Sequence, residues 1–330
     1  MFTFVLTGFE ASGAGESTLP PALGGFVVLY DTESVPVMLA HAPGLAVIYL
    51  DTAVITPDGT LEDSAPAALL GTLVLRRLPT ELTVSNLVSP RASVDTRLIV
   101  AILHSRGREE SLIRALAAAA AEPPFDGINV DFEGVPRRDG PALTRFIGAL
   151  ASALHGEHRL LSIDVPALTR RDARKSAFSY RGLGRRVDAM LIMAYDYSYP
   201  GSRPGPIAPV WWVRRVLSYA AATIPAPKIR LGIPFYGYDW AGRDAAGLTL
   251  GQVQALITSH HARIHWNARG EAPYFLYTLH HHRHIVYYMD RKSLRLVLAA
   301  ARQAGIDGLF YWFVGSGRQA LWDLAATYHN

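Results

Sequence analysis

The sequence predicts an α/β protein built as a (β/α)8 TIM barrel, with a small α+β insertion between the seventh and eighth strands. Eight short, nearly continuous apolar runs alternate with helical segments, a pattern typical of parallel strands covered on both faces. The length of 330 residues suits one such barrel. Half of the residues are apolar and 18% are charged, which provides for a sizeable core and argues against disorder.

The predicted strands and helices follow one another in regular order. Strands are expected at 25–30, 45–50, 81–87, 125–133, 160–166, 189–196, 229–236 and 308–313. Helices are expected at 32–42, 65–77, 109–121, 141–154, 210–222 and 292–304, and a turn at 57–59. The apolar run 98–103 is compatible with either a strand or a helix, and we prefer a helix because Asp95 suits its N-cap.

The ends of the chain and the last long connection depart from this alternation. Residues 1–23 are expected to form an N-terminal lead-in or tail, and 24–330 the barrel. The connection between the seventh and eighth strands is too long for one crossover helix. It contains a predicted helix near 249–258 and a hairpin that pairs 273–279 with 284–289, so we place the insertion at 237–290.

Composition excludes several classes of function. The absence of cysteine excludes disulfides, thiolate metal sites and cysteine nucleophiles. A net charge of +4 is compatible with anionic polymers, but no nucleic-acid-binding motif is present. No apolar run reaches the length of a membrane span, and the first residues lack a clear secretory signal. These observations do not indicate the cellular compartment. The HExxH, GxSxG and P-loop motifs, which mark other classes of enzyme, are absent.

The most informative stretch is 125–133, where an apolar strand pattern carries four acid or amide groups. On a strand, Asn129, Asp131 and Glu133 share one face, while the apolar residues between them share the other. Carboxylates two positions apart lie roughly 6–7 Å apart and raise each other's proton affinity. One of them is then expected to stay protonated near neutral pH, as an acid catalyst requires. The alternative is a strand end whose acids are solvated or paired with arginine.

This stretch resembles the D-x-x-D-x-D-x-E signature of glycoside hydrolase family 18, read here as Asp126, Asn129, Asp131 and Glu133. The resemblance spans roughly 24–330. It implies that Glu133 is the general acid and that the 2-acetamido oxygen of the substrate is the nucleophile. It also implies that Asp131 orients the acetamide and stabilises the oxazolinium intermediate, with Asp126 among the substrate contacts. Asn129 replaces an acid of the signature, and we expect its amide to donate to Asp131.

Other residues at strand ends extend the resemblance. Residues 193–196 resemble the M-x-Y-D element of the family, which implies that Tyr195 donates to the acetamide carbonyl and that Met193 and Asp196 bind substrate. Trp312 stands where the family places the floor beneath the sugar. Buried packing is the alternative for these aromatic residues. Tyr236, Tyr238 and Trp240 line the cleft or pack, and we count Tyr236 and Asn86 among the substrate contacts.

The histidine cluster 280–284 does not predict a metal site. Neighbouring side chains on a strand point in opposite directions, and the cluster falls on the predicted hairpin turn. We therefore expect an exposed turn. No metal and no organic cofactor are predicted, because the resemblance implies that the substrate supplies the nucleophile.

Three stretches resemble the spore cortex-lytic branch of the family: Asn129 with Phe132 before Glu133, the run 205–209, and the run 232–240. This resemblance implies an N-acetylglucosaminidase that acts on peptidoglycan, in a spore or cell envelope. The partner would be a glycan containing N-acetylglucosamine, and a monomer is expected. A chitinase or chitooligosaccharide hydrolase is the alternative. A non-catalytic carbohydrate-binding barrel is disfavoured because Glu133 is present.

Overall fold

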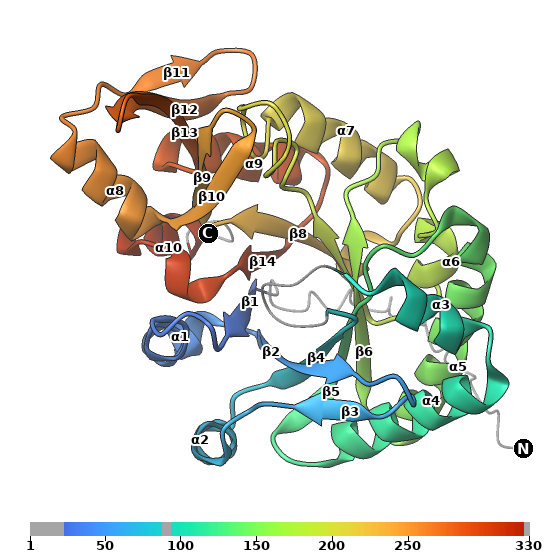
Figure 1. The fold of residues 1–330 in the computed structure, drawn as a ribbon. Helices are drawn as coiled ribbons and strands as arrows, with labels where there is room; N and C mark the ends of the chain where they lie inside the picture. The colour runs from blue at the N-terminus through green and yellow to red at the C-terminus, as the bar shows by residue number, and fades with distance from the viewer. Residues whose placement is uncertain (1–22, 88–93, 327–330) are drawn as a thin grey trace, which may run out of the picture.

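A computed structural model describes residues 23–87 and 94–326, so the predicted lead-in at 1–23 lies outside the described residues except for Leu23, which begins the first strand. Eight strands pair in parallel around a barrel, and the last of them pairs with the first (Figure 1). They are β1 (Leu23–Val28), β2 (Val47–Ile55), β4 (Thr80–Ser85), β5 (Phe125–Asp131), β6 (Leu160–Pro166), β7 (Ala189–Met193), β8 (Ile229–Pro234) and β14 (Gly308–Trp312). The predicted (β/α)8 barrel is confirmed.

Helices follow the strands and cover the outside of the barrel. They are α1 (Ser34–His41), α2 (Ala67–Arg76), α3 (Thr96–Leu103), α4 (Arg106–Ala121), α5 (Gly140–Gly156), α6 (Tyr180–Gly184), α7 (Val210–Ala221), α9 (Arg291–Gln303) and α10 (Gln319–Ala326). The ambiguous run 98–103 is helical, and the Asp95 carboxylate accepts a hydrogen bond of 2.8 Å from the Leu98 amide, as an N-cap does. None of the helices in the described ranges is long and apolar enough to cross a bilayer.

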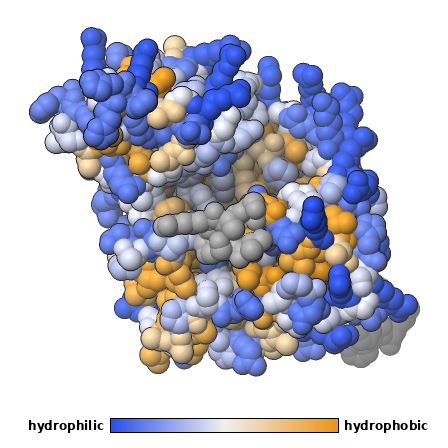
Figure 2. Space-filling model, in the orientation of Figure 1, coloured by the Kyte–Doolittle hydropathy of each residue, from blue (hydrophilic) through white to orange (hydrophobic). Residues whose placement is uncertain are grey.

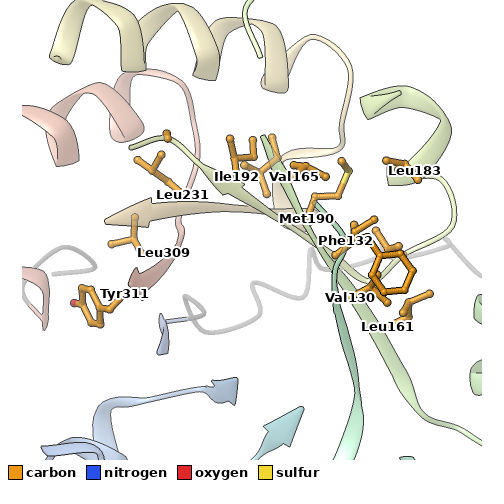
Figure 3. Packing of buried hydrophobic residues seen from close by; sticks show 14 of the residues in the cluster. Val130, Phe132, Leu161, Val165, Leu183, Met190, Ile192, Leu231, Leu309 and Tyr311 are labelled. Carbon is orange, nitrogen blue, oxygen red and sulfur yellow. The ribbon is translucent and has the colours of Figure 1, made fainter. Parts of the chain in front are cut away.

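The main core lies between the strands and these helices. Figure 3 shows the side chains of Val130, Phe132, Val165 and Ile192 gathered on the outward face of the sheet. Phe132 packs against Phe146 of α5, with ring centroids 5.7 Å apart. Because side chains alternate along a strand, this outward packing turns the polar residues of β5 toward the barrel interior.

The insertion follows β8 as a five-stranded antiparallel sheet with one helix. Its elements are β9 (Tyr236–Ala241), β10 (Asp244–Thr249), α8 (Leu250–Ser259), β11 (His265–Asn267), β12 (Ala272–Leu279) and β13 (His282–Tyr288). The predicted helix and hairpin are present, and the insertion presents mainly hydrophilic residues on the face shown in Figure 2. His280 and His281 form the exposed hairpin turn with left-handed backbones (φ 47° and 65°), as expected. Trp240 is fully buried, so it packs and does not line a cleft.

One hairpin was not expected from the sequence. β2 continues past residue 50 to Ile55 and pairs antiparallel with β3 (Leu61–Asp63) through the predicted turn at 57–59. The left-handed backbone of Gly59 (φ 81°) closes this turn. The pairing of β2 with β4 shifts between Asp51 and Ala53, which marks a bulge beside the carboxyl ends of the barrel strands.

Candidate active site

A cavity of about 380 Å³ lies at the carboxyl ends of the barrel strands. The residues that line it come from β5, β6, β7 and β14 and from the segments that follow these strands. They are Asp131, Glu133, Asp164, Pro166, Ala167, Met193, Tyr195, Asp196, Trp212 and Trp312. Residues more than a hundred positions apart thus meet at one end of the barrel, where enzymes of this architecture carry their chemistry.

Glu133 follows β5 directly, and its main chain is held in place by Asn86. The Asn86 side chain accepts a hydrogen bond of 2.8 Å from the Glu133 amide and donates one of 3.0 Å to the Glu133 carbonyl. Asn86 is fully buried beyond the end of β4. Burial raises the pKa of the half-buried Glu133 carboxyl, and the negative charge of Asp196 raises it further. A proton is therefore retained on Glu133 at higher pH than on an ordinary glutamate.

Asp131 and Asp164 form a buried acidic pair on the neighbouring strands β5 and β6. The two side chains are only 6% and 3% exposed. Burial raises the pKa of both carboxyls well above the ordinary range. The charge of Glu133 raises the pKa of Asp131 further, and the charge of Asp131 raises that of Asp164 further. These carboxyls cannot all ionise together in a buried site. The site consequently holds protons as well as negative charge.

Asn129 bonds to β6 rather than to Asp131, which corrects the expected hydrogen bond. Its amide donates to the Ser162 hydroxyl at 2.9 Å and to the Asp164 carboxyl at 3.3 Å. The Ser162 hydroxyl in turn donates to the carboxyl of Glu81, which lies inside the barrel on β4. Asn129 is therefore the centre of a buried polar chain across three strands and fixes the position of Asp164.

Tyr195 extends from the end of β7 into the cavity and lies against Gly232 of β8. A β-carbon at Gly232 would stand 2.6 Å from the Cε1 atom of Tyr195, so only glycine leaves room for this ring. Burial raises the pKa of the Tyr195 hydroxyl well above its ordinary value, and the charge of Asp164 adds to this effect. The phenol therefore stays protonated and can donate a hydrogen bond to a ligand.

Asp196 is fixed by two tyrosines of the insertion. The Tyr236 hydroxyl donates to one carboxylate oxygen, and the Tyr238 hydroxyl donates to the other at 3.1 Å. Asp196 itself has a left-handed backbone (φ 55°), which turns its side chain toward the cleft. Tyr236 is buried and is absent from the lining of the cavity, so the structure gives it this supporting contact rather than the expected direct one.

Trp312 separates the first cavity from a second one of about 530 Å³, because its side chain lines both. The second cavity runs over β2 and β3 and is lined by Asp51, Glu62 and Asp63, among others. Burial raises the pKa of Asp51 to about 6, and the charge of Glu133 contributes. The two cavities together make a cleft with Trp312 at its centre and carboxyl groups on both sides.

Besides Tyr236, two residues expected to contact substrate, Asp126 and Asn86, do not line the first cavity. Asp126 is exposed at the start of β5, where its carboxylate accepts a hydrogen bond of 3.0 Å from the Thr80 amide at the opposite end of the barrel. Asn86 is occupied with the main chain of Glu133. The structure does bring together Asp131, Glu133, Met193, Tyr195, Asp196 and Trp312, and Asn129 lies directly behind them.

Sequence reasoning missed two acids of the site, Asp51 and Asp164. Asp51 directly follows the predicted strand 45–50, and Asp164 lies near the end of the predicted strand 160–166. Both would have been found if every acid near the carboxyl end of a predicted barrel strand had been counted as a candidate. No group of three or more His, Cys, Asp or Glu side chains in the described part of the chain is arranged to hold a metal ion.

Comparison with known proteins agrees with this geometry. The profile of the glycosyl hydrolases family 18 matches residues 99–317, about two thirds of the chain, including β5, the cavity and β14. The chain belongs to glycosyl hydrolase family 18. The matched region contains both the acids of β5 and the Met193–Asp196 element.

Its relatives include glycosylases of Bacillus subtilis, and it resembles solved chitinase structures. The chain is 26% identical to the uncharacterized glycosylase YvbX of Bacillus subtilis over 97% of its own length and 93% of that protein. It is 27% identical to the cortical fragment-lytic enzyme of Bacillus subtilis over 69% of its length, but spans only 56% of that enzyme. A chitinase structure from Chromobacterium violaceum superimposes with a TM-score of 0.87 at 28% identity, covering 93% of this chain and 98% of the chitinase.

Proposed function

We propose that this family 18 chain is a retaining glycoside hydrolase that cleaves β-1,4 bonds after N-acetylglucosamine in peptidoglycan, such as spore cortex or cell wall fragments. Catalysis is substrate-assisted and proceeds through an oxazolinium intermediate. The observation that carries the proposal is the position of Glu133: a carboxyl with a raised pKa, fixed through its own main chain by Asn86, in one cavity with Asp131 and Tyr195.

In the first step, the Glu133 carboxyl gives its proton to the glycosidic oxygen as the bond from that oxygen to C1 breaks. The acetamide oxygen of the same sugar forms the new bond to C1. The Tyr195 hydroxyl donates to the acetamide and aligns it, and Asp131 accepts from its N–H and stabilises the positive charge that develops there. Trp312 supplies the rigid apolar face under the sugar ring.

In the second step, the ionised Glu133 takes a proton from a water molecule, whose oxygen attacks C1 on the face that the leaving group vacated. The bond from the acetamide oxygen to C1 breaks, the acetamide is restored and Glu133 regains its proton. Two displacements at C1 leave the product with the configuration of the substrate. The buried chain through Asn129 holds Asp164 beside Asp131, so that proton sharing between these acids accommodates the change in charge.

Two substrates compete for this chemistry. Peptidoglycan is favoured by the similarity to the cortical fragment-lytic enzyme and by the resemblance of 205–209 and 232–240 to the cortex-lytic branch. Chitin oligosaccharides are the second candidate, because the chitinase of Chromobacterium violaceum matches almost the whole length of both chains. The catalytic residues would be the same in both cases, so only the cleft and the substrate distinguish them.

The test is mass spectrometry of the products released from purified, defined peptidoglycan by the wild type and by Glu133→Gln. We expect new reducing ends on N-acetylglucosamine from the wild type alone. If neither protein cleaves peptidoglycan, both are tested on chitooligosaccharides, where cleavage by the wild type alone would support the second candidate. If neither substrate is cleaved, the proposed hydrolase is wrong. Equal cleavage by Glu133→Gln would remove Glu133 as the acid.

A further inference from the structure

A groove of about 1330 Å³ lies on the outside of the barrel, away from the candidate active site. It runs between α5 and the segment that leads from η3 (Asp172–Lys175) through α6 to β7, and Figure 1 shows these helices side by side. Its lining includes the five arginines Arg137, Arg145, Arg174, Arg185 and Arg186. The other lining residues are small or carry hydroxyls, which lets a ligand approach the helix surface closely.

The stretch of sequence that supplies the lining of this groove is strongly basic. Residues 137–186 contain eleven Lys and Arg and four Asp and Glu, a net charge of +7. The remaining sequence contains 21 basic and 24 acidic residues, a net charge of −3. The net positive charge of the protein thus comes from this one stretch of the sequence. Clustered charge of one sign creates a local potential that attracts ions of the opposite sign.

The guanidinium groups of the groove are largely available to a ligand. None of the residues that line the groove is acidic. Arg145 pairs with Glu109 at 3.1 Å, and Arg186 lies over Gly148 and donates to the Gly182 carbonyl. The other three, Arg137, Arg174 and Arg185, are exposed, and within the described ranges their side chains form no hydrogen bond or ion pair. Guanidinium forks match carboxylate and phosphate oxygens in pairs.

The composition of the groove favours an anionic wall polymer over other ligands. No aromatic side chain lines the groove, so it offers no platform on which a sugar ring or a nucleic-acid base could stack. Residues of η2 (Arg137–Asp139) and η3 line the groove, and these two short helices follow β5 and β6 in the chain. The segment after β5 thus contributes Glu133 to the cavity and Arg137 to the groove, and the segment after β6 contributes Ala167 to the cavity and Arg174 to the groove.

We propose that this arginine groove binds the anionic groups of a cell wall polymer, carboxylate or phosphate, and thereby holds the enzyme on its insoluble substrate. The inference rests on the proposed function, since it concerns the polymer that enters the same cleft. Neutral chitin lacks such groups, so the groove distinguishes the two candidate substrates. The carboxylates belong to the peptide stems of peptidoglycan, whereas the phosphates belong to polymers attached to it.

The test is retention of the protein on insoluble polymers at increasing salt concentration. The groove variant carries Arg137→Gln, Arg174→Gln and Arg185→Gln together. A control variant carries Arg263→Gln, Arg283→Gln and Arg291→Gln, which removes the same charge from exposed positions elsewhere. The polymers are intact cell wall sacculi, sacculi stripped of phosphate polymers with hydrofluoric acid, chitin, and immobilised duplex DNA. Hydrolysis of a soluble neutral chitooligosaccharide measures the active site separately.

We expect the groove variant alone to bind sacculi about tenfold more weakly at low salt, because several exposed charge contacts act together. Binding to chitin and hydrolysis of the soluble oligosaccharide stay unchanged. Loss on both kinds of sacculi assigns the ligand to peptide-stem carboxylates, and loss only on intact sacculi assigns it to phosphates. Equal retention of the two variants overturns the proposal, as does tighter, arginine-dependent binding of duplex DNA than of sacculi. If the wild type does not hydrolyse the soluble oligosaccharide, that result counts against the proposed function and not against the groove.

Discussion

Replacement of Glu81 by glutamine should stabilise the protein at neutral and alkaline pH. Glu81 lies inside the barrel on β4 with 5% of its surface exposed. Burial raises the pKa of its carboxyl to about 7, although the hydrogen bond from Ser162 opposes this shift. Glutamine has the same length and keeps an oxygen that accepts from Ser162, but it cannot ionise. The substitution therefore removes only the burial of a negative charge.

The sign and size follow from the two pKa values. A carboxyl with a raised pKa in the folded state favours folding fully below the unfolded value of 4.5, and this contribution is lost as the pH rises to about 7. The difference between the two values corresponds to about 3 kcal/mol of unfolding free energy. Above pH 7 the Glu81→Gln protein should thus be more stable than the wild type by up to about 3 kcal/mol, and near pH 4 the two should be equal.

The assay is thermal unfolding of both proteins between pH 4 and pH 8. For a chain of 330 residues, a gain of 3 kcal/mol raises Tm by about 4 °C. Glu62→Gln, on the exposed strand β3, is the control and should leave the pH dependence of Tm unchanged. A Tm lowered equally at pH 4 and pH 8 by Glu81→Gln would refute the reasoning, because the neutral carboxyl would then contribute contacts that glutamine cannot replace.

Three further predictions concern the active site. Asp196→Asn should shift the basic limb of the pH profile of kcat/KM to lower pH, because loss of that negative charge lowers the pKa of Glu133, which must carry a proton; an unchanged limb would contradict this. Gly232→Ala should lower kcat by about fivefold to 150-fold, since the added carbon displaces the Tyr195 ring at a cost of about 1–3 kcal/mol. A wild-type kcat would show that the ring adapts. Asn86→Ala should lower kcat with little change in KM, because Asn86 holds the main chain of Glu133, and should reduce the unfolding free energy by about 1–3 kcal/mol. Steady-state kinetics and urea unfolding measure the two effects. A raised KM alone would instead support a direct substrate contact.

The barrel could be predicted because each of its strands is buried on both faces. A short apolar run between helices has few other arrangements open to it, so the eight strands lie close to their predicted positions. The β2–β3 hairpin was missed because residues 51–55 are partly polar and read as a loop. That extension positions Asp51 over the second cavity, which explains why this acid also escaped notice.

Asp126 lies far from the candidate active site because it is at the opposite end of β5 from Asp131. The signature groups it with Asp131, yet five residues of extended chain separate them by roughly 16 Å. Asp126 therefore lies at the start of β5, where it bonds to the Thr80 amide, and Asp131 lies at the end, inside the cavity. A spacing in sequence tells which residues share a face of a strand, but only the ends of the strand tell which of them reach the site.

Local periodicity and short motifs at strand ends were enough to predict the fold class, the family and the group formed by Asp131, Glu133 and Tyr195. The contacts that support these residues could not be predicted before the strands were placed beside one another. Asn86 reaches the main chain of Glu133 across 47 positions, and Asn129 bonds to Asp164 instead of Asp131. Such contacts depend on which strands are neighbours and on their register, and a single strand's sequence contains neither.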